Sequence, residues 1–170
     1  LKGLETYYRA RLTRAPNDVE GQVRFARLLA RQQRVEDAVA ALRELVKKAP
    51  SVRTARQALI DLLVAQQQWG DVAKEHAELD RLSPGDADNV RAWGQAVLRD
   101  ESRAIAERRS AAESIWKRLL TAKPKDAAAH VQVAEWLRSI DRTDEAIALY
   151  RRAIRSEEHT SELQSHLNLV

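Results

Sequence analysis

The chain contains no cysteine and no methionine, and it has only 5 glycines and 4 prolines among its 170 residues. The absence of cysteine excludes a disulfide framework, a thiolate zinc site and a thiol nucleophile. Because tight turns depend on glycine and proline, their scarcity argues against a β-sandwich or a β-barrel. Without methionine, Leu1 is not an initiator, which indicates a fragment or a processed chain. These absences favour an all-helical protein.

Long apolar runs are also missing from the sequence. The longest, such as residues 38–42, are far shorter than the ~20 residues that a membrane-spanning helix needs. We therefore expect no membrane partner. The sequence leaves the location unknown, with the cytoplasm as the default. Hydrophobic residues make up 44% of the chain and charged residues 32%, a balance that is typical of a folded protein and not of a disordered one.

The prolines are regularly spaced, at Pro16, Pro50, Pro84 and Pro124, with intervals of 34, 34 and 40 residues. Each follows a segment with apolar residues at i, i+4 and i+7 or i+8, the pattern of one helix face. Proline then ends the helix because it lacks an N–H group. A second amphipathic segment follows each proline, so the pattern predicts repeated pairs of helices.

Short polar residues precede the first helix of each predicted pair. Their side chains can accept a hydrogen bond from a free N–H group of the first helical turn. The candidate capping residues are Asn17 and Asp18, Ser51, Asp86 and Asp88, and Asp126.

This arrangement resembles the tetratricopeptide repeat. The family pattern has large residues at positions 7, 11 and 24, small residues at positions 8, 20 and 27, and proline at position 32. The fourth repeat matches it well, with Val133, Ala134, Leu137, Ala146, Tyr150 and Ala153. The resemblance extends from residue 1 to about residue 154. It implies an all-α, right-handed solenoid of antiparallel helix pairs that is truncated at both ends.

The resemblance also implies an organisation for the chain. Residues 1–15 would be the second helix of a truncated repeat, and a solenoid would occupy residues 16–154. Its repeats are expected over residues 19–52, 53–86, 87–126 and 127–154. The third repeat holds about six extra residues within 100–109, which either lengthen its second helix or form a longer loop.

Residues 155–170 depart from the repeat, because Glu158 stands where the pattern expects proline. Their sequence RSEEHTSELQSH resembles one translated frame of a common short-read sequencing adapter. We hypothesise that residues from about 155 onward are an assembly artefact. The alternative is a genuine polar tail.

Candidate catalytic residues are few. Outside the tail the only histidines are His76 and His130, and both fall within helical repeats, where a packing role is favoured over a catalytic base. No metalloprotease, nucleophile-elbow or phosphate-loop motif occurs. We therefore expect no catalytic, cofactor or metal site, and no enzyme activity in this segment.

In this family the first helices of the pairs line a concave face. The resemblance places nine candidate partner-binding residues there: Arg27, Arg31, Gln57, Asp61, Arg91, Gln95, Arg99, Glu135 and Arg138. Guanidinium groups bind carboxylates through two hydrogen bonds. The predicted function is therefore a protein–protein interaction scaffold whose groove takes an acidic peptide or helix. The alternative is a solvated charged face without a specific ligand.

Two other functions compete with this one. Helical repeats that read RNA need a base-reading residue at a repeated position, whereas position 5 holds the dissimilar set Val23, Gln57, Arg91 and Val131. Nucleic acid is therefore a disfavoured partner. The other alternative is a structural spacer, fused to an enzymatic or signalling domain, that self-associates through its uncapped ends.

Long-read sequencing of the source DNA tests the adapter hypothesis. If it holds, the codons after Ile154 continue the helix and reach a proline near position 158, as the repeat period requires. Genomic codons that spell RSEEHTSELQSH would show that the tail belongs to the protein.

Overall fold

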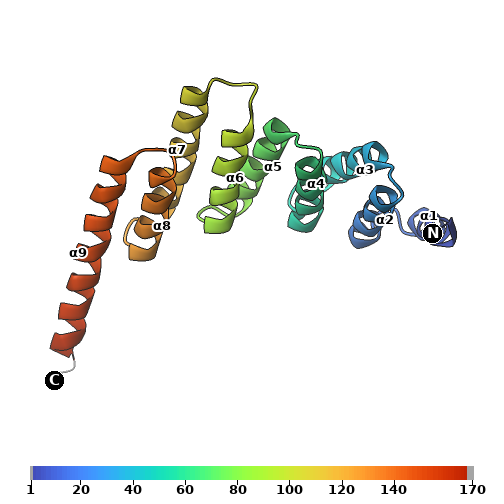
Figure 1. Cartoon of the computed structure of the whole chain (residues 1–170). Coiled ribbons are helices and arrows are strands. Elements are labelled where there is room, and N and C mark those ends of the chain that lie inside the picture. The colour runs from blue at the N-terminus through green and yellow to red at the C-terminus, as the bar shows by residue number, and fades with distance from the viewer. Residues whose placement is uncertain (1, 168–170) are drawn as a thin grey trace. The chain divides into compact units, whose positions relative to one another are not determined.

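The computed structural model describes the backbone of residues 2–167 and the side chains of residues 3–156. Every regular element in this part of the chain is an α-helix (Figure 1), so the all-α prediction is confirmed. The helices are α1 (Lys2–Arg14), α2 (Val19–Arg31), α3 (Val35–Lys48), α4 (Arg53–Ala65), α5 (Trp69–Leu82), α6 (Ala87–Arg99), α7 (Ile105–Ala122), α8 (Ala127–Arg138) and α9 (Thr143–Leu167). None of them, over the described residues, is long and apolar enough to cross a membrane.

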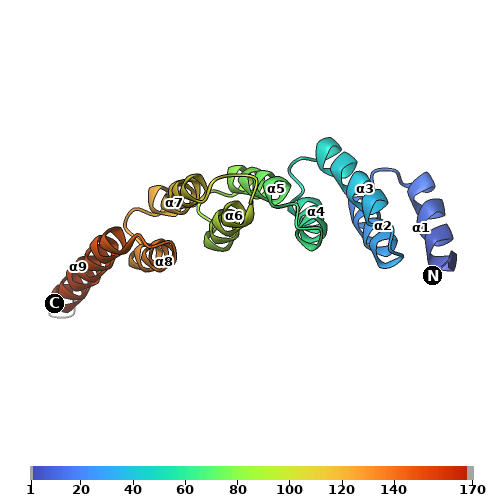
Figure 2. The ribbon, with the colours of Figure 1, turned by 45° about the horizontal axis from the view of Figure 1, so that its top comes forward.

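The helices belong to two compact units, one ending at Glu75 and the other beginning at His76, within α5. In the first unit α2 packs against α3 and α4, and α1 packs against α2. In the second unit α6 pairs with α7 and α8 pairs with α9, while α7 also contacts α8 (Figure 2). Short connections join the helices of each pair, so the paired helices are antiparallel, as predicted.

The core consists of the residues that the helical periodicity places on one face. Leu42, Leu59 and Leu119 are at most 1% exposed. Small residues stand where paired helices approach each other, and those at repeat positions 8 and 20 are fully or almost fully buried: Ala26, Ala38, Ala112, Ala134 and Ala146. Burying a leucine side chain contributes roughly 1.5–3 kcal/mol, so the stability of each unit comes mainly from these buried apolar residues.

Three turns inside helix pairs contain one residue in the left-handed region. These residues are Gln33 (φ 63°), Gln67 (φ 56°) and Asp141 (φ 66°), and each lies two or three residues after the first helix of its pair. The scarcity of glycine means that ordinary side chains take this conformation, at some cost in strain. The α6–α7 connection, residues 100–104, is longer and turns without such a residue in the described chain.

The extra residues of the third repeat are divided between helix and loop. The second helices α3 and α5 have 14 residues each, whereas α7 has 18 and begins at Ile105. The connection before α7 has five residues, against three before α3 and α5. About four residues therefore lengthen the helix and about two lengthen the loop, so each alternative holds in part.

At three of the four helix starts one of the predicted residues forms the cap. Asp18 accepts a hydrogen bond from the N–H of Gly21, Asp86 from that of Asn89, and Asp126 from those of two alanines in α8. The prediction for Ser51 was wrong. Val52 is the residue directly before α4, and it provides no side-chain cap.

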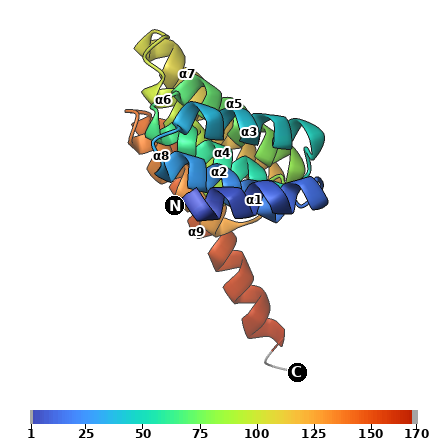
Figure 3. The ribbon, with the colours of Figure 1, turned by 90° about the vertical axis from the view of Figure 1, so that its right-hand side faces the viewer.

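The backbone of α9 stays helical from Thr143 to Leu167, so the helix continues well beyond the length of α8 (Figure 3). The hypothetical adapter segment thus adopts helix up to Leu167. Its side chains from residue 157 onward, and residues 168–170 entirely, lie outside the described residues. The origin of the tail stays a prediction.

Gly94 of α6 provides a test of how closely α6 and α7 pack in the second unit. A Cβ atom added there would lie 2.0 Å from Nε1 of Trp116, whose side chain is only 1% exposed and has no room to move. We expect Gly94→Ala to lower the free energy of unfolding by roughly 1–3 kcal/mol, because overpacking forces neighbouring groups to shift. Urea unfolding measures the change.

Gly3→Ala is the matched control, because a Cβ atom at Gly3 would meet nothing within 4 Å. This control should be neutral or slightly stabilising, since alanine is the better helix former. Identical unfolding midpoints for Gly94→Ala and the wild type would contradict the packing argument.

Candidate functional site

A hollow lies between α2 and α4, the first helices of two successive pairs in the first unit. It has a volume of about 590 Å³. Its lining residues are Val19, Glu20, Val23, Arg24, Arg27, Thr54 and Gln57. The five from α2 fall on successive turns of the helix, at residues 19–20, 23–24 and 27, so they share one helix face. Val19 and Val23 are the apolar part of that lining, and Val23 is 6% exposed.

The charges in this hollow do not cancel. Arg24 forms an ion pair with Glu20 one helical turn earlier. Arg27 is exposed and has no ion-pair partner among the side chains that the structure describes. From α4, Thr54 and Gln57 add neutral polar groups. The lining therefore presents one uncompensated positive charge above an apolar surface.

All nine candidate residues from the sequence analysis are exposed. In the first unit, the hollow brings Arg27 of α2 and Gln57 of α4 together. Gln57 Nε2 donates a hydrogen bond to Asp61 Oδ1 at 3.1 Å. Arg31, one turn beyond Arg27, has no ion-pair partner among the described side chains.

The other five candidates lie in the second unit. Arg91, Gln95 and Arg99 are on α6, and Glu135 and Arg138 are on α8. Arg91 Nη2 lies 3.1 Å from Asp88 Oδ1. The charge of Arg91 is therefore partly compensated within its own helix, which the sequence pattern did not indicate.

Both histidines outside the tail are buried, as the packing interpretation predicts. His76 is 6% exposed, and its Nδ1 lies 2.8 Å from Oδ1 of Asn89. The Nδ2 group of Asn89 donates a hydrogen bond to the His76 carbonyl oxygen. His130 is 2% exposed, and its Nδ1 lies 2.8 Å from the Asp126 carbonyl oxygen. Across the described residues no three histidine or acidic side chains gather in a way that could hold a metal ion.

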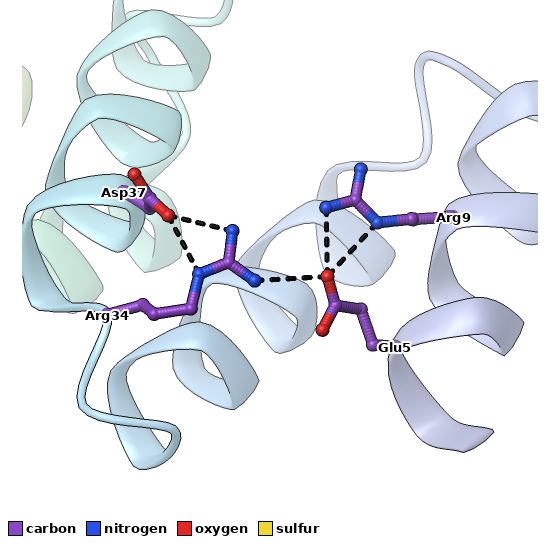
Figure 4. Close-up of polar contacts among 4 residues, drawn as sticks. All are labelled: Glu5, Arg9, Arg34 and Asp37. Carbon is purple, nitrogen blue, oxygen red and sulfur yellow. Dashed lines mark hydrogen bonds and ion pairs between the residues drawn. The ribbon is translucent and has the colours of Figure 1, made fainter. Parts of the chain in front are cut away.

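A set of ion pairs, which the sequence pattern did not indicate, joins the second helices of successive pairs. In the first unit Glu5 of α1 lies between two arginines (Figure 4). Its Oε1 accepts from Arg9 Nη2 at 2.8 Å and from Arg34 Nη1 at 3.1 Å, and Arg34 also pairs with Asp37. Hydrogen bonds from Arg9 and Arg34 hold the pKa of Glu5 below its usual value.

The same arrangement recurs in the second unit. Glu113 of α7 accepts from Lys117, four residues later, at 2.6 Å and from Arg142, before α9, at 2.9 Å. Lys117 also pairs with Glu145 in the first turn of α9. The hydrogen bond from Lys117 holds the pKa of Glu113 below its usual value.

A smaller version of this set, with a single ion pair, joins α3 to α5. Arg43 Nη2 lies 2.7 Å from Asp71 Oδ2, and these residues are 28 apart in sequence, as are Lys117 and Glu145. Val39 replaces the acid four residues before Arg43. Basic residues followed by acids at this interval are the sequence signal that would have revealed the pairs.

Glu5→Gln tests the contribution of the first cluster. Because the folded-state pKa of Glu5 is lowered, its pairs stabilise α1 above the ordinary value of 4.5, and this stabilisation is lost as the pH falls through the folded pKa. At pH 7 we expect amide exchange in α1 to be roughly 2- to 5-fold faster in Glu5→Gln than in the wild type. The difference should shrink at pH 3.

The control is Glu44→Gln, which removes an exposed carboxylate of α3. It should leave exchange in α1 unchanged at both pH values. A difference between Glu5→Gln and the wild type that persists at pH 3 would contradict the role assigned to the charge.

Comparisons with known proteins agree with this geometry. The family model described as tetratricopeptide repeat matches residues 6–77. Protein O-mannosyl-transferase Tmtc1 from Drosophila melanogaster is 31% identical over 125 residues, which are 71% of this chain but 14% of that protein. The chain thus spans a small part of that relative, and the transferase activity in its name is a property of the relative.

Solved structures show the same fold. A double mutant of MamA has a TM-score of 0.59 at 15% identity, over 94% of this chain and 86% of that one. MamA from Desulfovibrio magneticus RS-1, from residue 41 onward, has a TM-score of 0.57 at 16% identity, over 93% of this chain and 86% of that one. Residues 6–77 thus match the tetratricopeptide repeat family, and the likeness to the solved structures shows the fold.

Proposed function

We propose that the hollow between α2 and α4 binds an acidic peptide segment of a partner protein. A tetratricopeptide repeat chain is a scaffold for protein–protein contacts, which gives the class of function. The uncompensated charge of Arg27, beside the apolar surface of Val23, carries the finer proposal.

The geometry suits an extended segment. Arg27 and Arg31 are four residues apart on α2, so their side chains are neighbours on one helix face and can each take a carboxylate. Arginine binds carboxylates through two hydrogen bonds, which fixes orientation as well as charge. Thr54 and Gln57 supply polar groups for the peptide backbone. The exposed Gln95, Arg99, Glu135 and Arg138 are proposed as contacts of the second unit.

Val23 also argues against base reading. This position-5 side chain has no polar group with which to read a nucleotide. Protein recognition is therefore favoured over RNA.

Fluorescence anisotropy with a labelled 12-residue Asp/Glu-rich peptide tests the proposal. We expect Arg27→Glu/Arg31→Glu to weaken binding by roughly 10-fold or more, because it replaces two charge-assisted contacts by repulsion. The matched control is Lys47→Glu/Lys48→Glu, which makes the same change in net charge on α3, outside the hollow.

Two further probes decide between functions. The same peptide with Asn and Gln in place of its acids should bind much more weakly, and equal binding would contradict an acidic ligand. Oligouridine that binds more tightly than the acidic peptide, with a steep dependence on salt, would favour the nucleic-acid alternative.

A further inference from the structure

Arg24 is the second arginine that lines the α2–α4 hollow, and it forms an ion pair with Glu20, which lines the same hollow. Both side chains of this pair are largely in solvent, at 58% exposure for Arg24 and 68% for Glu20. An exposed pair one helical turn apart contributes only about 0.3–0.5 kcal/mol. A carboxylate from another molecule can therefore take the place of Glu20 at a small cost in free energy.

A buried pair in the same unit behaves differently. Arg56 of α4 pairs with Glu75 of α5, and their side chains are 6% and 20% exposed. Nη2 of Arg56 also donates a hydrogen bond to the Pro50 carbonyl oxygen at 3.2 Å. Displacing Glu75 would leave a buried guanidinium without its carboxylate, which is strongly destabilising. Of these two pairs, Glu20–Arg24 is the one that a ligand can exchange.

The position of Glu20 keeps the cost of this exchange low. Glu20 lies in the first turn of α2, two residues after the capping residue Asp18. The partial positive charge of a helix N-terminus stabilises an acid there, whether or not that acid contacts an arginine. Glu20 therefore keeps one favourable interaction after it has released Arg24.

The spacing of the two arginines in the hollow indicates which ligand could replace Glu20. Arg24 and Arg27 are three residues apart on α2, and side chains at this interval are neighbours, with Cβ atoms about 5–6 Å apart. In an extended peptide, side chains two residues apart lie on the same side, roughly 7 Å from each other. Acids at i and i+2 of such a peptide therefore fit the two guanidinium groups.

We propose that Glu20 is an internal stand-in for a ligand carboxylate, and that a peptide with two acids separated by one residue binds Arg27 and displaces Glu20 from Arg24. This inference rests on the proposed function, because it concerns the same hollow. It adds a residue that lowers affinity by competition and a spacing that the ligand needs. A segment with a single acid gains the contact with Arg27 and leaves the Glu20–Arg24 pair in place.

Fluorescence anisotropy with two labelled peptides tests the inference. Both are 12-residue Gly/Ser peptides. The two-acid peptide has Glu at its positions 6 and 8, and the single-acid peptide has Glu at position 6 and Gln at position 8. We expect Glu20→Gln to tighten binding of the two-acid peptide by roughly 2- to 5-fold, because it frees Arg24 and removes a like charge. The affinity of the single-acid peptide should rise by less than about 1.5-fold.

Glu44→Gln is the matched control, because it makes the same change in net charge on α3, outside the hollow. It should leave the affinity of both peptides unchanged. Adding Arg24→Gln to Glu20→Gln should remove the gain for the two-acid peptide, since the freed guanidinium is then absent. Both replaced side chains are more than half exposed, so these variants should keep the fold of the wild type.

Two results would overturn the inference. The first is a response to Glu20→Gln that is no larger for the two-acid peptide than for the single-acid peptide, and the second is a gain that survives Arg24→Gln. Either result leaves the proposed function standing if Arg27→Glu/Arg31→Glu weakens binding of the two-acid peptide. If that double variant binds as tightly as the wild type, the proposed function itself fails.

Discussion

A pair of helices of about 13 residues each cannot bury both of its apolar faces, and isolated helices of this length are marginal in water. Each pair is therefore stable only against a neighbour, and this need shapes the rest of the chain. The close approach of neighbouring helices follows from this need for burial. Ala26, Ala38 and Gly94 stand where helices meet, because larger side chains would hold the helices apart.

Apolar burial has little directional preference, so something else must fix how one pair is aligned on the next. The ion pairs between successive second helices can do this. An exposed pair such as Arg43–Asp71 contributes little to stability, about 0–1 kcal/mol. Its two residues are 28 apart in the sequence, however, and they reach each other in one alignment of the two helices. The clusters around Glu5 and Glu113 repeat that geometry with more hydrogen bonds.

The helix pairs were predictable because proline marks their ends and apolar spacing marks their faces. The boundary between loop and helix in the third repeat could not be predicted, since residues such as Ala104 and Ile105 suit either a loop or a helix. The left-handed Gln33 and Gln67 were also missed, because the usual signal for that conformation is glycine. In the site, the resemblance pointed to Arg27 and Gln57, and the hollow contains both. That Glu20 neutralises Arg24 follows from side-chain conformations that a sequence does not specify.

Binding by such a surface depends on the charges that remain after internal pairing, and a count of arginines overstates them. Arg24, Arg43 and Arg91 are compensated by acids of their own unit. Arg27 in the hollow is left without an ion-pair partner among the described side chains, and it lies beside an apolar surface. Desolvation by that surface strengthens a contact with a carboxylate, whereas a charge in open water gains little. On our proposal, the α2–α4 hollow, which combines apolar surface with an unpaired positive charge, is a place where an acidic partner gains affinity.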